Sequence, residues 1–239
     1  MTARKIRVAY LCHEYPKLTE TFVYREIDRL RKLGLDVAVY AMKQPATIVE
    51  IDGAEDKIRA TRYLAPDFSF KFIFAQIYAL LTSFCKYFRL LWHILKVNSH
   101  VSAMPFRVRL GFFLRGALAA YELRRDPQIT ILHTPYTGDE IIAAHVASVL
   151  SGLPLSFTLH APLPLYRRSP LLKLQARHAA LIAAISEDAR RRIVELAGKG
   201  IENRVKIVRC GVDLPEKTVN YTPPGTLPRI ISVGSPSPC

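Results

Sequence analysis

Polar residues follow strand-like apolar segments at five places in the chain. Their histidine, carboxylate, hydroxyl and guanidinium groups are types that bind polar ligands through hydrogen bonds. Ligands of a doubly wound sheet bind beyond the carboxyl ends of its strands, so we expect these segments to meet along one edge. The segments are residues 13–16, 134–139, 160–162, 186–187 and 209–213.

Missing motifs argue against several other chemistries. The chain has no GxGxxG after its first strand and no GxxxxGK[ST], GxSxG or HExxH, so neither a dinucleotide fingerprint nor a phosphate loop is predicted. Its seven histidines are scattered, and we expect no metal site. The four cysteines are widely spaced without a CxxC pair, which indicates a reducing cytoplasm rather than a disulfide scaffold.

The order of elements predicts the fold class. The first predicted strand is a near-continuous apolar run, as in parallel strands that are covered on both faces. Strands alternate with helices throughout, which predicts an α/β fold with a doubly wound parallel sheet. Strands are expected over residues 6–12, 37–42, 129–133, 155–159, 180–185 and 205–208, and helices over residues 19–33, 139–150 and 187–197.

Two interpretations of the first predicted helix stay open. The free amides at its start could hold an anionic group, because helix N-termini attract negative charge. Alternatively, Thr19 caps the helix and Glu20 stabilises its first turn in the ordinary way.

Residues 68–121 differ from the rest of the chain because they contain no Asp or Glu. Basic residues are interspersed there with aromatic and aliphatic ones, and the longest uncharged run, residues 72–85, has 14 residues. A membrane span needs about 20, so we expect none. Three interpretations remain: core helices with a basic outer face, a segment at a membrane interface whose Lys and Arg meet anionic lipid, or, more weakly, a nucleic-acid binder.

Composition and the two ends of the chain add further expectations. The net charge of +14 over 239 residues implies an anionic partner. The N-terminus lacks the apolar core of a signal peptide. Near the C-terminus, residues 229–234 resemble a strand entering a new unit, but the two prolines that follow cannot supply its helix. We therefore expect one domain over residues 1–217, and over residues 218–239 a linker and the first strand of a truncated second domain.

Six segments of the chain form an ordered series: YPKLTETFVYREIDRLRKLG, LHTPYTGD, GLPLSFTLHAP, IAAISEDARRRI, VKIVRCGVDL and RIISVG. This series resembles the family-four-type glycosyltransferases of GT-B fold, and within them the bacterial exopolysaccharide and colanic-acid type. The resemblance covers nearly the whole chain, with residues 45–128 the least diagnostic. It implies the N-terminal half of a GT-B fold, in which a Rossmann-like acceptor domain faces a second domain for the nucleotide-sugar.

The resemblance also implies roles for single residues. His160 matches the histidine of the family's FT-x-H element and is expected near the transferred sugar, where it would act in catalysis; the alternative is a histidine that only organises its own loop. Ser186 is expected in the cleft, with a plain helix cap as the alternative. The acceptor-binding residues would be Glu14, Tyr15, Pro16, Thr19, Thr21, Tyr136 and Thr137. The residues facing the second domain would be Ser186, Glu187, Arg209, Gly211 and Asp213.

Some positions depart from the family pattern. Pro135 stands where relatives often have the second histidine of HAHF, and Cys210 stands where Asn is usual. The downstream basic pair and the E-x7-E element, which in relatives hold the donor, do not follow residues 229–234.

The resemblance implies the acceptor-binding half of a retaining glycosyltransferase that uses a nucleotide-diphosphate sugar, needs no cofactor or metal, and is inactive alone. The acceptor would be a cell-surface polysaccharide or a lipid-linked saccharide. We expect the protein in the cytoplasm, peripherally associated with the anionic inner face of the membrane and not with nucleic acid. The alternative is a non-catalytic membrane- or glycan-binding module that pairs with a separate donor domain.

Overall fold

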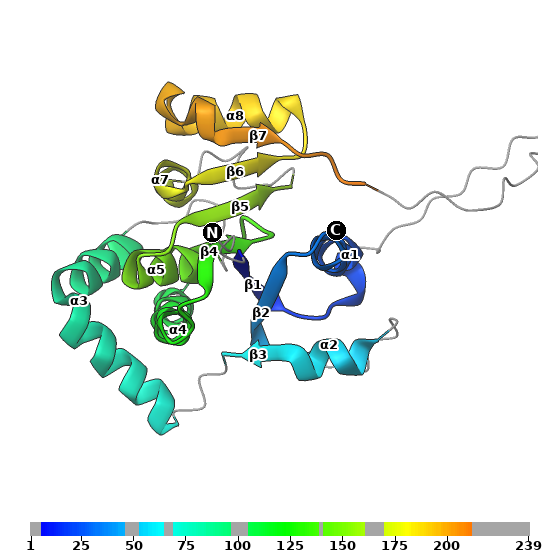
Figure 1. Ribbon diagram of the computed structural model, residues 1–239. Coiled ribbons are helices and arrows are strands. Elements are labelled where there is room, and N and C mark those ends of the chain that lie inside the picture. The colour runs from blue at the N-terminus through cyan, green and yellow to red at the C-terminus, as the bar shows by residue number, and fades with distance from the viewer. Residues whose placement is uncertain are drawn as a thin grey trace, which may run out of the picture.

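The computed structural model describes residues 6–45, 53–64, 69–96, 105–138, 141–160 and 170–211. Seven parallel strands form one sheet in the order β3-β2-β1-β4-β5-β6-β7 (Figure 1). Successive strands step outward from β1 to one side as far as β3, and from β4 to the other side as far as β7. The strands are β1 Arg7–Glu14, β2 Asp36–Lys43, β3 Thr61–Tyr63, β4 Ile129–Thr134, β5 Leu155–Leu159, β6 Leu181–Ala184 and β7 Val205–Ile207.

This arrangement confirms the predicted α/β fold with a doubly wound, Rossmann-like sheet. The direction of winding reverses between β1 and β4, which is the point where such sheets bind ligands. For six of the strands, the predicted first and last residues differ from the observed ones by no more than two residues. Strand boundaries ordinarily differ by this much. The strand β3 was missed because it has only three residues, Thr-Arg-Tyr, and no apolar run.

Helices cover the two faces of the sheet unequally (Figure 1). The helix α1 (Thr21–Lys32) packs on one face, over β1 and β2, and α2 (Ala54–Ala60) lies beside β3. The opposite face is covered by α4 (Phe106–Arg124), α5 (Ile141–Ser151), α7 (Pro170–His178) and α8 (Glu187–Ala197). The face with α1 therefore has fewer described helices over β4, β5 and β6 than the face with α5.

The helices α4 and α5 approach each other closely because both present small residues. A Cβ added at Gly116 would lie 2.7 Å from the carbonyl oxygen of Ala143 and 2.7 Å from Cβ of Val146. Nine of the eleven residues of α5 are buried, so this helix is enclosed between the sheet and its neighbours. Such a helix is apolar all round rather than amphipathic.

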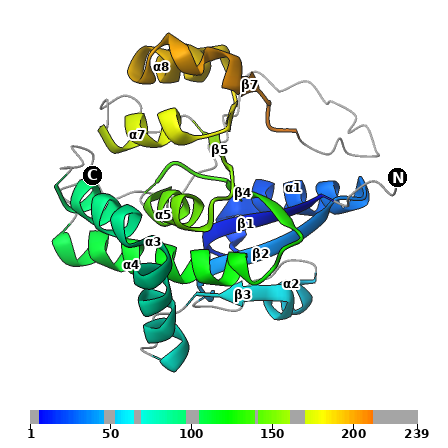
Figure 2. The same cartoon turned by 60° about the vertical axis from the view of Figure 1, so that its left-hand side comes forward.

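The helix α3 (Phe70–Lys96) forms an outer layer on α4 and α5 (Figures 1 and 2). Its backbone leaves the helical conformation at Ser83 (φ −148°, ψ 38°), so it consists of two arms at an angle to each other. We call residues 70–82 the N-terminal arm and residues 84–96 the C-terminal arm. Each arm buries one stripe, with Phe72, Ala75 and Ala79 in the first and Tyr87, Leu90 and Ile94 in the second.

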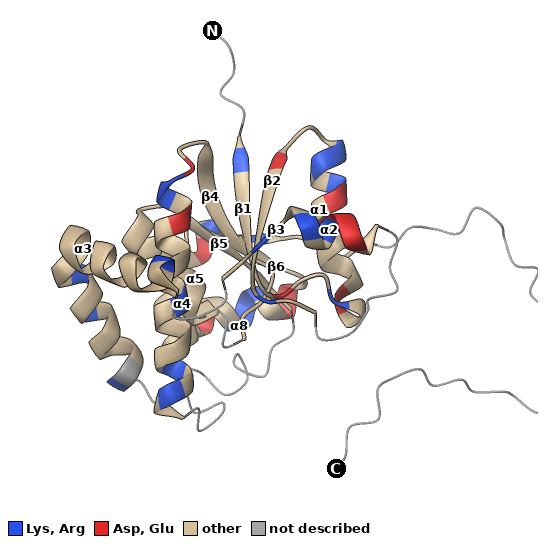
Figure 3. Ribbon diagram, turned by 90° about the horizontal axis from the view of Figure 1, so that it is seen from below, with Lys and Arg blue, Asp and Glu red and all other residues tan. Residues whose placement is uncertain are grey.

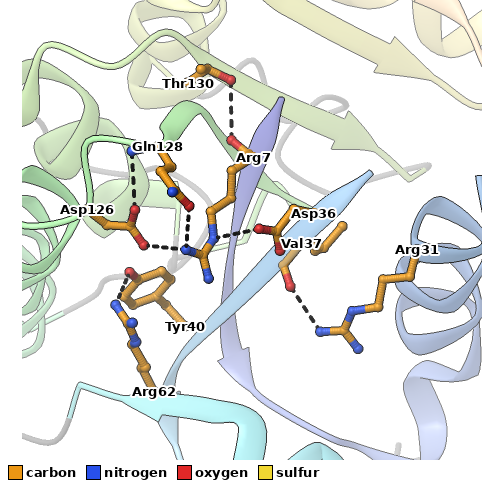
Figure 4. A network of polar contacts seen from close by, with 9 residues as sticks. All are labelled: Arg7, Arg31, Asp36, Val37, Tyr40, Arg62, Asp126, Gln128 and Thr130. Carbon is orange, nitrogen blue, oxygen red and sulfur yellow. Dashed lines mark hydrogen bonds and ion pairs between the residues drawn. The ribbon is translucent and has the colours of Figure 1, made fainter. Parts of the chain in front are cut away.

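An arginine joins three strands at their amino ends (Figure 4). Arg7 Nη1 lies 2.9 Å from Asp126 Oδ2, and Arg7 Nε lies 3.4 Å from Asp36 Oδ2 at the start of β2. Arg7 also donates a hydrogen bond to the side-chain oxygen of Gln128, and its carbonyl oxygen accepts one from Thr130 in β4. These contacts lie at the edge opposite to the loops that were predicted to form the site.

The start of α1 differs from the prediction. A short 3-10 turn, Leu18–Glu20, precedes a helix that begins at Thr21. Thr19 is therefore not the helix cap. Glu20 occupies the capping position, and its side chain makes no capping hydrogen bond. The helix predicted over residues 139–150 is described from Ile141 to Ser151. Residues 212–239, with Asp213, the domain boundary and the predicted strand 229–234, lie outside the described residues.

Candidate functional site

A cavity of about 610 Å³ lies on the face of the sheet that carries α1. Alternate residues of β1, β4, β5 and β6 form its floor, since successive side chains of a strand point to opposite faces. Among the described elements, α1 is the one helix that contributes to the walls, and residues 208–211 after β7 form the opposite side. The floor residues are Val8, Tyr10, Ile131, His133, Ser156, Thr158, Leu181 and Ala183.

Three rings from three separate elements meet where the strands end. The ring centroid of Phe22, in the first turn of α1, lies 4.5 Å from that of His160, which follows β5. Tyr136, in the loop after β4, lies 5.7 Å from Phe22 and 6.1 Å from His160. The predicted convergence of these loops is thus seen for the loops after β4 and β5.

His160 has one nitrogen engaged and one without a partner. Its Nδ1 lies 3.9 Å from Sγ of Cys210, in the segment after β7. Its Nε2 is buried and has no hydrogen-bond partner among the described residues. Burial lowers the pKa of the imidazole below its usual value, so the ring is neutral at neutral pH. A neutral imidazole can both donate and accept one hydrogen bond, so Nε2 is free to serve a ligand.

A second histidine lies deeper in the cavity and is fully used by the sheet. The two ring nitrogens of His133 lie 2.8 Å from Oγ of Ser156 and 3.3 Å from Oγ1 of Thr158. Burial, and to a smaller extent His160, lowers its pKa to about 4. His133 is therefore a neutral, fixed group that orders the polar floor of the cavity.

A half-buried carboxyl, that of Glu26, lies on the α1 side of the cavity. Tyr10 donates a hydrogen bond of 3.0 Å from its hydroxyl to Oε1 of Glu26. Burial raises the pKa of Glu26 above its usual value. Exposed basic side chains border the same cavity, those of Arg25, Arg29 and Arg209. The cavity therefore has histidine and hydroxyl groups on its floor, the Glu26 carboxyl on its α1 side and positive charge at its border.

Several of the predicted site residues lie at the cavity or near it. His160, Arg209 and Gly211 line the cavity, and Tyr136 contacts His160. Thr21 begins α1, one residue before Phe22, and Glu14 ends β1 in register with Lys43 of β2.

The remaining predicted residues that the structure describes do not line the cavity; they cap a helix, lie on the surface or are buried. Ser186 Oγ accepts a hydrogen bond from the backbone N–H of Ala189 at 3.1 Å, so it caps α8. Glu187 is exposed and pairs with Arg190 on the same helix. Thr19 is exposed on the 3-10 turn. Buried positions are occupied by Tyr15, Pro16 and Thr137.

Sequence reasoning missed several residues of the cavity. The predicted helix over residues 19–33 contains Phe22 and Glu26, but neither was predicted as a site residue, because each resembles other apolar or charged residues of that helix. One signal was available: Ser156 and Thr158 alternate with apolar residues in β5, which shows that one face of this strand meets polar groups. The missed residues are Tyr10, Phe22, Glu26, His133, Ser156 and Thr158.

Within the described ranges, no group of three or more His, Cys, Asp or Glu side chains could hold a metal ion. No described helix is both long and apolar enough to cross a membrane.

Similarity to known proteins identifies the family of the chain and supports its fold. A family model described as Glycosyltransferase Family 4 matches residues 19–216. No curated protein matches the chain. The crystal structure of Anabaena HepE in complex with UDP and glucose is similar, with a TM-score of 0.50 and 13% sequence identity over 87% of this chain and 45% of that one. At this identity the likeness concerns the fold, and the chain spans less than half the length of HepE.

Proposed function

Because the chain belongs to glycosyltransferase family 4, we propose that it is the acceptor-binding half of a retaining glycosyltransferase that uses a nucleotide-diphosphate sugar. The observation that supports this most directly is the buried Nε2 of His160, which has no partner in the described structure and lies beside a cavity of about 610 Å³. Ligand sites in proteins typically combine such a hollow with aromatic walls and a few fixed polar groups.

The surroundings of His160 suit a saccharide. A sugar ring has apolar faces and hydroxyl groups around its edge. Phe22 and Tyr136 supply aromatic surface next to the imidazole. The neutral imidazole supplies a hydrogen-bonding nitrogen for a hydroxyl of the transferred sugar. Held in this way, the sugar would be fixed in place as positive charge develops on its ring.

The remaining chemistry belongs to the second half of the enzyme. A departing nucleoside diphosphate is negatively charged, and we propose that basic side chains and a helix N-terminus of that half stabilise it without a metal ion. HepE was crystallised with UDP and glucose, which supports a nucleotide-sugar donor here. In this proposal residues 1–217 form the acceptor domain, residues 218–239 lead into the donor domain, and the 239-residue chain does not transfer sugar alone.

The acceptor we propose is an exopolysaccharide precursor or another lipid-linked saccharide at the cytoplasmic face of the membrane. The resemblance to exopolysaccharide and colanic-acid enzymes supports this class. The net charge of +14 also supports it, since a lipid-linked acceptor lies in an anionic surface.

The test uses the purified 239-residue chain in two assays. In the first, NMR spectra of its histidine rings are recorded while lipid-linked saccharides extracted from membranes are added. We expect the His160 signals to shift, because a bound acceptor lies against the place of the transferred sugar, which His160 borders. In the second, labelled nucleotide-sugars are added, and we expect no transfer. If no saccharide perturbs His160, the acceptor role is wrong. Sugar transfer by the chain alone would contradict its assignment as one half of the enzyme.

A second candidate is a non-catalytic module that binds a glycan or membrane beside a separate donor domain. The exposed basic border of the cavity, Arg25, Arg29 and Arg209, is compatible with such a role. Supplying a nucleotide-sugar-binding domain of this family in trans separates the two candidates. Restored turnover favours the enzyme half, whereas saccharide binding without turnover favours the module.

A further inference from the structure

The C-terminal arm of α3 has two apolar faces, and the described fold uses only one. Tyr87, Leu90 and Ile94 are buried against α4 and α5. On another side of the arm three large aromatic residues are exposed at a spacing of four, which places them in one row along the helix. They are Phe84, Phe88 and Trp92, with 62%, 47% and 65% of their surfaces exposed. We call this row the aromatic ridge.

Positive charge flanks the aromatic ridge on the same arm, and the arm itself carries no acidic residue. Lys86, Arg89 and Lys96 are exposed on the same arm, and Nζ of Lys96 lies 5.1 Å from the centre of the Trp92 ring. No Asp or Glu occurs between residues 68 and 121, and Figure 3 shows basic segments but no acidic one along α3. Aromatic side chains next to uncompensated Lys and Arg are typical of segments that lie in the interface of an anionic membrane.

The ridge lies toward the end of the domain where the candidate site is found. The helix α4 ends at Arg124 and β4 begins at Ile129, so the chain reverses and α4 runs opposite to the strands. The first residues of α4 are therefore level with the carboxyl ends of the strands. Arg109, in its first turn, donates a hydrogen bond of 3.4 Å to the carbonyl oxygen of Ile94. This contact brings the end of the C-terminal arm to the same level.

We infer that the aromatic ridge docks on an anionic lipid bilayer. Phe84, Phe88 and Trp92 would enter the headgroup region with the arm parallel to the surface, while Arg89 and Lys96 meet anionic headgroups. A bilayer is favoured over a protein partner because the surface combines aromatic side chains with basic ones and has no acidic residue on the same arm. Such a combination suits a surface that is both apolar and negatively charged. The inference rests on the proposed function in one respect: docking would give the protein access to a lipid-linked acceptor.

The N-terminal arm provides a matched comparison within the same helix. It also exposes large apolar residues, among them Phe70 and Leu81, with 94% and 81% of their surfaces exposed. Its one basic residue, Lys71, already pairs with Glu122 at 2.8 Å. Further positive charge beside this arm comes from Arg124 at the end of α4, which lies at the amino edge of the sheet, away from the candidate site. We therefore do not assign this arm to the bilayer.

Trp92 is the one tryptophan in the sequence, so its fluorescence reports on the ridge directly. The full chain is mixed with vesicles of phosphatidylcholine, and with vesicles that also contain phosphatidylglycerol. We expect the emission to shift to shorter wavelength, and to be quenched by brominated lipid chains, with the anionic vesicles. An emission that stays unchanged while the protein sediments with those vesicles would show that another surface binds.

Variants then separate the apolar and the charged contributions, with sedimentation of anionic vesicles as the measurement. Phe84→Ser with Phe88→Ser should lower the partition coefficient about tenfold or more, because each ring loses its burial in the interface. Arg89→Gln with Lys96→Gln should lower it roughly fivefold for each charge removed. The control, Phe70→Ser with Leu81→Ser, removes comparable exposed surface from the other arm and should leave it unchanged.

Two further outcomes would overturn the inference. One is a control that loses binding while the ridge variants keep it. The other is a Trp92 emission shift that depends on protein concentration in the absence of lipid, since a second copy of the chain would then cover the ridge. Neither outcome affects the saccharide-binding assay at His160, so failure of membrane docking and failure of the proposed function are distinguishable.

Discussion

The ring centroids of Phe22 and His160 lie 4.5 Å apart, and this contact fixes the imidazole between the first turn of α1 and the end of β5. His160 therefore depends on two elements that are far apart in the sequence. With Nδ1 facing Cys210 and the ring face against Phe22, Nε2 is the nitrogen left for a ligand.

Removing the imidazole should weaken saccharide binding without unfolding the protein. We expect His160→Ala to lower the affinity for a saccharide about tenfold, the value of one hydrogen bond to a buried group. NMR titration measures the affinity, and thermal unfolding checks the fold. His93→Ala, at an exposed position on α3, is the control and should bind as the unaltered chain does. Equal affinity of both variants would exclude His160 from the binding site.

Stability should fall in mild acid because two histidines are buried in the neutral form. Burial lowers the pKa of His133 to about 4 and that of His145 to about 3, against an unfolded value near 6.5. Between these values the unfolded chain binds more protons than the folded one, so the free energy of unfolding decreases as the pH falls. From pH 7 to about pH 5 each histidine should cost about 2 kcal/mol.

Urea unfolding at a series of pH values measures this effect. In the variant His133→Gln the free energy of unfolding should decrease less steeply as the pH falls, because one of the two buried histidines is gone. This holds even if the variant is less stable at every pH. A slope that is the same with and without His133 would show that this histidine titrates alike in both states.

The contact between α4 and α5 should reject even one added methyl group. Gly116→Ala places a Cβ 2.7 Å from backbone and side-chain atoms of α5, and we expect a loss of about 1–3 kcal/mol. Gly111 in the same helix is the matched control. There, the added methyl meets only the end of the Arg115 side chain, at 3.3 Å, so Gly111→Ala should stabilise by about 1 kcal/mol. Opposite signs in chemical denaturation are the expected result, and equal signs would contradict the close packing.

The arginine at the amino edge of the sheet should matter for stability but not for ligand binding. Arg7→Gln leaves the partly buried Asp126 without its cation, and we expect a loss of about 2 kcal/mol. Arg59→Gln removes an exposed pair with Glu55, whose side chains are 74% and 83% exposed, and should cost no more than about 0.5 kcal/mol. Thermal unfolding distinguishes the two, and a double-mutant cycle with Asp126→Asn isolates the pair.

The sequence predicted the sheet better than it predicted the site. Strands such as residues 6–12 are near-continuous apolar runs, and that pattern reports burial on both faces. Histidines and loops at strand ends could be placed along one edge, which brought out His160 and Tyr136. The floor of the cavity could not be predicted because it depends on which strands are neighbours. His133, Ser156 and Thr158 become one hydrogen-bonded group only when β4 and β5 pair.

Residue type alone also failed to separate local capping from ligand binding. Thr19 and Ser186 are both good helix caps, yet only Ser186 makes the hydrogen bond. A 3-10 turn before α1 shifts the helix start by two residues and leaves Thr19 exposed. Such a shift has no clear signature in the order of residues.

Both outermost strands of the described sheet, β3 and β7, are only three residues long. Backbone N–H and C=O groups at the rim of a sheet are a template on which other chains can add strands, and short rim strands offer few of them. Within the described part of the chain, the sheet thus has little capacity to recruit further copies into an extended β-assembly. Strand addition at these two edges should therefore not cause association at the high concentrations that the NMR titrations need.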